Sequence, residues 1–223
     1  MGAILSTLLL ILFSGVQDEP VRIPPGTVPE IDGFLSPGEW DDALRLPFSG
    51  GEAVLLKESG GNLFVGVHGA TGGFVSLGFG GQDSLKIFHA STALITASFV
   101  RHGETWERTH GFTEALAEGG TPYPRSADRT SRGYMDAQYE QFGWTANVVT
   151  LGPPTDPEFK IRVSDHPLRA TYLSVVMYQA RAATRVARAP DMLEDASIDP
   201  DLLQGSAGPV LDFDPHGWIR VIW

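Results

Sequence analysis

The feature that most constrains this chain is a regular alternation of short apolar runs with glycine-rich breaks. Runs rich in valine, isoleucine, leucine and phenylalanine recur through the first half, and glycine pairs at 50–51, 60–61, 72–73 and 80–81 separate them. Breaks that return roughly every 8–12 residues leave room for strands and little room for long helices. The sequence therefore predicts an all-β fold, an antiparallel β-sandwich of the jelly-roll kind with one or two short helices.

Ten strands are expected. They cover 52–58, 62–68, 73–79, 84–89, 92–101, 104–110, 144–150, 158–164, 171–179 and 217–223. The run 62–68 alternates clearly, so Leu63, Val65 and Val67 are predicted to share one face of a sheet. The opposite face would then receive Asn62, Phe64, Gly66 and His68.

Helices are expected to be short. Ser36 and Glu39 have the spacing of a capping box with Pro37 at the first helical position, which predicts a helix through Leu44 that carries Trp40 on its apolar side. A second short helix is predicted at 112–118. The stretches 119–132 and 181–209 are polar or acidic and are predicted to be long loops.

The first 17 residues have the character of an export signal. An apolar run at 2–13 is too short to span a bilayer as a helix and has the length of a signal-peptide core. No basic residue precedes it, so a buried first strand or helix is the alternative. We expect a signal peptide at 1–17, a single sandwich domain at 18–223 with a proline-rich strap at 20–29, and a secreted or periplasmic protein.

Charge and cysteine content exclude several classes of function. The 223 residues include 16 basic and 27 acidic ones, for a net charge of -11, and no cysteine. A nucleic-acid surface needs clustered cations, and a disulfide framework or a thiolate metal site needs cysteine. Composition excludes these classes without identifying a function, so the evidence for a function must come from local sequence motifs.

One motif carries a family resemblance. Residues 28–43 have the sequence VPEIDGFLSPGEWDDA, and residues 60–68 have the sequence GGNLFVGVH. This opening followed by this strand resembles the family nine carbohydrate-binding modules and the wider DOMON-like sandwich group. The matching positions are Ile31, Asp32, Gly33, Leu35, Glu39, Trp40 and Ala43, then Asn62, Leu63, Phe64, Val65 and Val67. The stretch 157–164 resembles a later strand of the group, with Arg162 where a proline is usual.

The resemblance implies a non-catalytic sandwich that holds a saccharide on aromatic rings with polar groups at the rim. Ile31 and Leu35 are expected to plug the end of the sandwich, Gly33 to permit a turn, and Trp40 to pack in the core. A neutral glycan or oligosaccharide is the expected partner, because the negative chain repels acidic polysaccharides.

Four residues outside this motif are the predicted ligand-binding set: Trp106, Arg108, Tyr134 and Trp144. The competing interpretation places both tryptophans in the core. If His102-Gly103 forms a two-residue hairpin turn, Trp106 falls opposite Phe99 and is buried.

A second motif suggests a different function. Residues 99–105, FVRHGET, resemble the signature of histidine phosphatases, which implies His102 as nucleophile, Arg101 and Arg181 as phosphate ligands and His216 as their partner. That family has long helices between parallel strands, which this sequence does not predict. A histidine phosphatase-type phosphohydrolase built on Arg101-His102-Gly103 is therefore the alternative, and a polar hairpin tip explains the same letters.

A third alternative is a haem- or protein-binding adaptor of the DOMON-like group. His68, Met135 and Met177 are the candidate haem ligands that this hypothesis implies. We predict no catalytic residue and no cofactor, with one exception. Acidic residues within 191–201 and 212–214 could hold a structural calcium ion, although their spacing is not that of a calcium loop.

Overall fold

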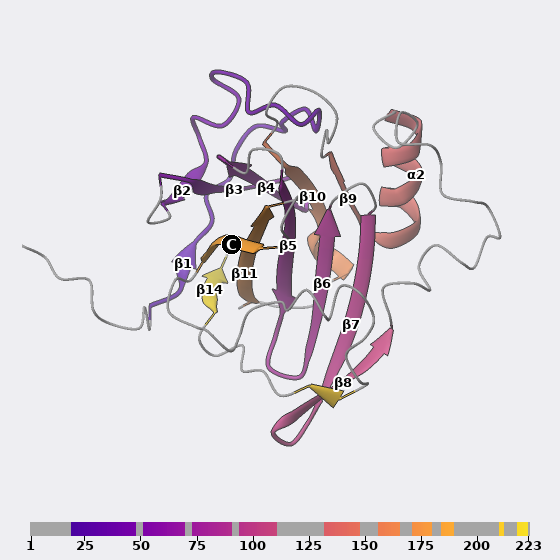
Figure 1. Cartoon of the computed structure of the whole chain (residues 1–223). Helices are drawn as coiled ribbons and strands as arrows, with labels where there is room; N and C mark the ends of the chain where they lie inside the picture. Colours follow the sequence, from indigo (N-terminus) through magenta and orange to yellow (C-terminus); the bar gives the residue numbers. More distant parts are fainter. Residues whose placement is uncertain are drawn as a thin grey trace, which may run out of the picture.

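The computed structural model describes residues 19–47, 51–69, 73–90, 94–110, 132–147, 156–165, 171–179, 184–189, 210–211 and 218–222. These ranges contain fourteen strands, one α-helix and one 3-10 turn, and the strands form two sheets (Figure 1). The predicted signal peptide at 1–17 lies outside the described residues. Within them, no helix is long and apolar enough to cross a membrane.

The smaller sheet has five strands, and all its neighbours are antiparallel. Glycines at 60 and 61 make its tightest turn, where both φ angles lie in the left-handed region that glycine adopts without steric cost. In spatial order its strands are β2 (Leu44–Pro47), β3 (Ala53–Ser59), β4 (Asn62–His68), β10 (Glu158–Arg162) and β9 (Trp144–Asn147).

The larger sheet has nine strands, and its one parallel pair joins β1 to β14. Along its main path it contains β1 (Val21–Arg22), β14 (Ile219–Ile222), β11 (Thr171–Gln179), β5 (Gly73–Gly80), β6 (Ser84–Ala90), β7 (Leu94–His102), β8 (Thr105–His110) and β13 (Val210–Leu211). Strand β12 (Thr184–Ala189) pairs with β11 off this path.

The main core lies between the two sheets. Alternate residues of both sheets meet there, among them Val65 and Phe159 from the smaller sheet and Leu77 from the larger one. Trp144 of the edge strand β9 is fully buried in this core, with its ring centroid 4.9 Å from that of Phe88, and its Nε1 donates to Thr96 Oγ1 at 2.7 Å. The predicted all-β sandwich is therefore confirmed.

All ten expected strands are present, and the alternation predicted for 62–68 is confirmed. Leu63, Val65 and Val67 belong to the main core, whereas Phe64 belongs to a second cluster on the other face of the same sheet. Strands β1, β2, β12 and β13 were not expected, and each has between two and six residues. Strand β12 corrects the loop predicted at 181–209, and residues 119–131 of the other predicted loop lie outside the described residues.

The helix predictions need correction. Residues 37–42 form consecutive turns, because Gly38 has a φ of 85°, which a right-handed helix does not allow. The helix predicted at 112–118 lies outside the described residues. The observed helix, α2 (Arg132–Phe142), was not expected; it packs against β9, and Gly143 ends it with a φ of 72°.

The proline-rich strap links the two sheets. Ile23 donates its N–H to Ile222 O of the larger sheet, and Glu58 N of the smaller sheet donates to Pro24 O. Ile23 is itself part of the main core. The chain thus enters between the layers before it crosses the outer face of the smaller sheet.

Candidate functional site

The outer face of the five-stranded sheet, which points away from the main core, carries an unusual set of buried polar residues. Lys57 and Glu158 are 0% exposed, and Thr145 and Asn147 are each 4% exposed. They lie in two neighbouring rows, since Glu158 pairs with Asn147 and Lys160 pairs with Thr145 in the ladder between β10 and β9. Burying a polar side chain costs free energy unless it forms hydrogen bonds or ion pairs, so the partners of each side chain must be identified.

The N-terminal cover, residues 27–43, lies over the β3 and β4 part of this face. Trp40 packs with Leu55 and Phe64, and Ile31 and Leu35 join the same cluster. This corrects the expectation that Ile31 and Leu35 plug the end of the sandwich, because the residues cover a sheet face instead. The burial expected for Trp40 is confirmed.

Gly66 makes the close approach of the cover possible. A Cβ atom at this position would lie 2.8 Å from Leu35 Cδ2 and 3.3 Å from the Trp40 ring. Only a residue without a side chain therefore leaves room for the cover on β4.

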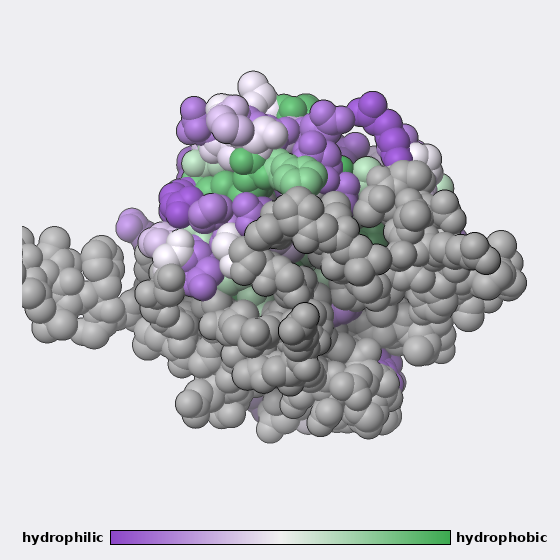
Figure 2. All heavy atoms as spheres, turned by 45° about the horizontal axis from the view of Figure 1, so that its top comes forward, coloured by the Kyte–Doolittle hydropathy of each residue, from purple (hydrophilic) through white to green (hydrophobic). Residues whose placement is uncertain are grey.

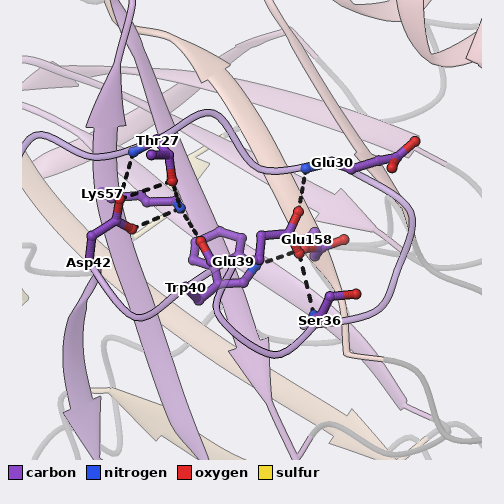
Figure 3. Close-up of polar contacts among 8 residues, drawn as sticks. All are labelled: Thr27, Glu30, Ser36, Glu39, Trp40, Asp42, Lys57 and Glu158. Carbon is purple, nitrogen blue, oxygen red and sulfur yellow. Dashed lines mark hydrogen bonds and ion pairs between the residues drawn. The ribbon is translucent and has the colours of Figure 1, made fainter.

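Lys57 anchors the cover at the β3 end (Figure 3). Its Nζ lies 3.0 Å from Asp42 Oδ1, donates to the backbone oxygen of Glu39 and to Thr27 Oγ1, and lies 4.9 Å from the centroid of the Trp40 ring. A hydrogen bond from the Thr27 backbone N–H and then the contact with Lys57 lower the pKa of Asp42 to about 2. The buried ammonium group is fully partnered.

Glu158 anchors the cover from β10. Its Oε2 accepts the N–H groups of Asp32 (3.0 Å) and Gly33 (2.8 Å), and its Oε1 accepts Trp40 Nε1 at 3.0 Å. Gly33 has a φ of 87°, which confirms the turn expected there. Burial raises the pKa of Glu158 to about 8, against the three N–H donors, which favour the carboxylate.

A cavity of about 410 Å³, the outer pocket, lies where the cover, α2 and the sheet face meet. This volume is within the range of small-molecule sites. Its walls come from three parts of the chain: Val28, Pro29, Glu30, Ile31 and Asp32 from the cover; Arg132, Met135, Asp136 and Tyr139 from α2; and Phe64, Thr145, Asn147 and Lys160 from the sheet.

Two polar atoms in this pocket are buried without a hydrogen-bond partner: Thr145 Oγ1 and Asn147 Oδ1. The other end of the Asn147 amide is occupied, since Nδ2 donates to Ile31 O at 3.2 Å. The remaining Oδ1 can only accept, whereas the Thr145 hydroxyl can donate or accept. Buried polar atoms nearly always have a partner, so this pair is an exception in the wall of the outer pocket.

Two cationic side chains lie against the ring of Tyr139, which lines the outer pocket. Lys160 places its Nζ 3.9 Å from the centroid of the Tyr139 ring, and Arg162 lies 4.5 Å from the same ring. Tyr139 donates its hydroxyl to Asn62 Oδ1. Its ring is therefore already in contact with two cations and is not a free stacking surface.

The surface around the cover is mixed. Figure 2 brings the top of Figure 1 forward and shows hydrophilic residues with a smaller number of hydrophobic ones between them. Among the described residues, the large exposed apolar side chains are Val28 and Phe34, and both belong to the cover.

The predicted ligand-binding set is not assembled as expected. Trp144 is 0% exposed and Trp106 is 1% exposed, so neither presents a ring face to solvent and the expectation of sugar stacking on them is wrong. The strand alternation directs Trp144 into the main core. Arg108 is half-buried on β8, and Tyr134 on α2 packs against the main core; Figure 1 shows these two elements well apart.

The hairpin register also differs from expectation. The turn lies at Gly103 and Glu104, so Trp106 pairs with Arg101 and Arg108 pairs with Phe99. Trp106 is buried, as the competing interpretation had it, although the partner which that interpretation gave is wrong.

The histidine phosphatase hypothesis fails on the fold. Its motif joins two antiparallel strands, and the exposed His102 lies 3.2 Å from Glu107, while Arg101 Nε donates to Gly103 O. That family needs a strand followed by a helix in a parallel sheet. Arg181 and His216 lie outside the described residues.

The candidate haem ligands are scattered. Met177 lies in the main core, Met135 lines the outer pocket, and the exposed His68 lies 3.3 Å from Asp156. The acidic stretches 191–201 and 212–214 lie outside the described residues. Within the part that the structure describes, no group of three or more metal-ligating side chains is present.

Sequence reasoning did not single out Thr145, Lys160 or the anchoring role of Glu158. A signal for the first was present: 144–147 alternates Trp-Thr-Ala-Asn, so a core-facing Trp144 directs Thr145 and Asn147 to the other face. Nothing in the sequence indicates that this other face is covered.

Comparisons with known proteins identify one similar structure and no similar sequence. No protein-family model matches the sequence, and no curated protein does. Among solved structures, a family 9 carbohydrate-binding module from Caldicellulosiruptor kristjanssonii, in complex with cellotriose, is similar to this chain with 12% identity and a TM-score of 0.38, covering 76% of this chain and 82% of that one. The sandwich itself is established by the two sheets described above.

Proposed function

We propose that this protein binds a small neutral saccharide, a glycan or oligosaccharide, in the outer pocket without breaking a bond. The observation that carries the proposal is the pair of buried, unpartnered atoms, Thr145 Oγ1 and Asn147 Oδ1, on one wall of the pocket. A ligand that forms a hydrogen bond with each atom would remove the free-energy cost of two buried polar atoms without partners.

A hydroxyl-rich ligand suits this pair best. Asn147 Oδ1 needs a donor and Thr145 Oγ1 accepts or donates, and sugar hydroxyl groups do both. Ile31, Met135 and Phe64 supply apolar surface in the same pocket for the C–H faces of a ring.

The charge pattern supports a neutral ligand. Arg132 and Lys160 face the pocket together with Glu30, Asp32 and Asp136, so neither sign dominates strongly. The resemblance of residues 28–43 and 60–68 to family nine carbohydrate-binding modules supports the same ligand class.

The proposal is tested by binding measurements on two variants. Thr145→Val keeps the shape of the site, whereas Asn147→Leu also removes the hydrogen bond from Nδ2 to Ile31 O. A glycan array identifies a binder, and calorimetry then compares wild type with Thr145→Val and Asn147→Leu. Each variant removes one hydrogen bond to the ligand, so affinity is expected to fall about three- to tenfold. Thr109→Val on β8 is the matched control, because Thr109 is exposed and its hydroxyl donates to Ser98 O.

Two results would refute the proposal. One is an array with no neutral saccharide bound by wild type. The other is a binder whose affinity is the same for wild type, Thr145→Val and Asn147→Leu, which would place the ligand elsewhere.

We also propose that the protein is exported, on the apolar run at 2–13 alone. Expression of the full chain followed by N-terminal sequencing tests this. A mature protein that begins near residue 18 supports export, and an intact Met1 in the cell extract contradicts it.

A further inference from the structure

Three polar side chains of the sheet line the outer pocket next to one another. Lys160 on β10 lies directly opposite Thr145 on β9 in the ladder, and Asn147 follows two positions along the same face of β9. Side chains directly opposite each other leave an antiparallel pair about 5 Å apart, and side chains two positions apart on one strand leave it about 7 Å apart. One small polar group of a ligand can therefore reach all three.

The three side chains differ in the hydrogen bonds that they can form. Lys160 is half-buried, its Nζ can only donate, and this atom lies 3.9 Å from the centroid of the Tyr139 ring. Within the described ranges, no carboxylate lies at ion-pair distance from Lys160. Thr145 Oγ1 can donate or accept, Asn147 Oδ1 can only accept, and both are buried without a partner. A complementary ligand group offers an acceptor to Lys160 and Thr145 and a donor to Asn147.

We propose that this group is the acetamido substituent of an N-acetylated amino sugar, so that the outer pocket selects acetamido saccharides and Lys160 determines this specificity. The amide carbonyl oxygen accepts from Lys160 Nζ and Thr145 Oγ1, and the amide N–H donates to Asn147 Oδ1. The inference deepens the proposed function and rests on it, because an acetamido sugar is a neutral saccharide.

The spacing of the side chains fits an amide better than one hydroxyl group. A trans amide with a hydrogen bond at each end separates its two partners by about 7 to 8 Å, which matches two positions on a strand face. One hydroxyl group that accepts from one partner and donates to the other separates them by only about 5 Å. Two neighbouring hydroxyl groups cover the distance, but the one that accepts from both Lys160 and Thr145 still needs an acceptor for its own proton, which a carbonyl oxygen does not.

The rest of the pocket favours an uncharged group with a methyl end. A carboxylate would satisfy Lys160 and Thr145, but it would place a negative charge beside Asn147 Oδ1 and near the acidic side chains of the pocket, such as Asp136. The acetamido methyl group finds apolar surface in Phe64, which lies opposite Lys160 in the ladder with β4 and lines the same pocket.

Two trisaccharides that differ only in the substituent at C2 test the inference. Calorimetry on the full chain compares N,N′,N″-triacetylchitotriose, which carries acetamido groups, with cellotriose, which carries hydroxyl groups. We expect wild type to bind triacetylchitotriose about tenfold more tightly, because a hydrogen bond from an ammonium group to a carbonyl oxygen is stronger than one between neutral groups.

Substitutions of Lys160 test its role in the preference. Lys160→Met keeps a long apolar stem and removes the ammonium group, so affinity for triacetylchitotriose should fall about tenfold and affinity for cellotriose less than twofold. A merely structural role would lower both affinities by the same factor. Lys160→Arg, which restores a cationic donor, should recover most of the preference. Lys86→Met on β6 is the matched control, the same substitution at a half-buried lysine of the other sheet, and should leave both affinities unchanged.

The possible results separate this inference from the proposed function. Equal affinities of wild type for the two trisaccharides would overturn the inference and leave the proposed function intact. A preference for triacetylchitotriose that is the same in wild type and Lys160→Met would also overturn it, because another residue would then recognise the acetamido group. If no neutral saccharide binds, the proposed function fails and the inference with it. The wild-type comparison and Lys160→Arg decide the matter if Lys160→Met does not fold.

Discussion

Both halves of the outer face bury polar side chains, but the two halves differ in whether the polar atoms have hydrogen-bond partners. On the β3 and β10 side, Lys57 and Glu158 direct every polar atom to the N-terminal cover. On the β9 side, Thr145 and Asn147 keep one atom each without a partner. The first half serves the fold, because its polar groups are satisfied within the chain. The second half remains incomplete until something else supplies hydrogen bonds.

Within the covered half, the two anchors differ in a second respect. Lys57 has a countercharge in Asp42, whereas Glu158 is met by three N–H dipoles and by no lysine or arginine within the described residues. Their pKa consequences are opposite in kind: Asp42 is lowered to about 2 and Glu158 is raised to about 8. The hydrogen bond from Thr27 N–H and the contact with Lys57 keep the Asp42 carboxylate ionised near neutral pH, whereas burial makes Glu158 sensitive to pH in that range.

The largest effect is expected from breaking the ion pair. Asp42→Ala leaves the ammonium group of Lys57 buried with no countercharge, and it should lower the free energy of unfolding by about 3 kcal/mol, the low end for a broken buried pair because Asp42 is partly exposed. Urea denaturation at pH 7 measures this. Lys57→Met, which removes the buried charge itself, should cost clearly less, and a larger loss for Lys57→Met than for Asp42→Ala would contradict this account of the anchor.

The second-largest effect concerns Glu158, the anchor without a countercharge, and it is a dependence of the free energy of unfolding on pH. A carboxyl group whose pKa is raised by folding gives stability that is complete below 4.5 and declines as the pH rises to about 8. The buried His89, with its pKa lowered to about 4 by burial, acts in the opposite sense between about 4 and 6.5. Among the described groups with a shifted pKa, Glu158 therefore controls the window from pH 6.5 to 8.

In this window the free energy of unfolding of wild type should fall by about 2 kcal/mol, at about 1.4 kcal/mol for each pH unit. Glu158→Gln should remove the slope, although it lowers stability overall by placing an amide N–H₂ among N–H donors. Denaturation series at several pH values check both points. A slope that persists in the variant would assign the titration to another group.

These two anchors also mark the limit of prediction from sequence. The alternation in 62–68 and the glycine pair at 60–61 predicted β4 and its turn, because strand period and turn chemistry are local. The contacts of Glu158 join residues 125 and 126 positions apart, and no local pattern encodes them. The helix α2 was missed because its sequence is polar, with Gln138 its one buried residue, so its packing on β9 leaves no clear apolar stripe.

The closeness of the cover itself can be tested at Gly66. Gly66→Ala places a Cβ atom 2.8 Å from Leu35 Cδ2, and the cover must lift to accommodate it, at a cost of about 1.5 kcal/mol. Gly133→Ala on α2 is the matched control: nothing lies within 4 Å, and alanine should stabilise this helix slightly. Thermal unfolding of both variants separates the two cases, and a neutral Gly66→Ala would mean that the cover packs loosely.

The smallest effect concerns the incomplete half, and its sign is opposite. Thr145→Val replaces a buried hydroxyl that has no partner with a methyl group of similar size, so the free energy of unfolding should rise by about 1 kcal/mol in the absence of ligand. The same change at Thr96, whose hydroxyl accepts Trp144 Nε1 in the core, should lower it by a similar amount. Urea denaturation of both variants measures the difference. A loss of stability on Thr145→Val would show that Thr145 already has a partner, and the two halves of the outer face would then differ only in the segments that cover them.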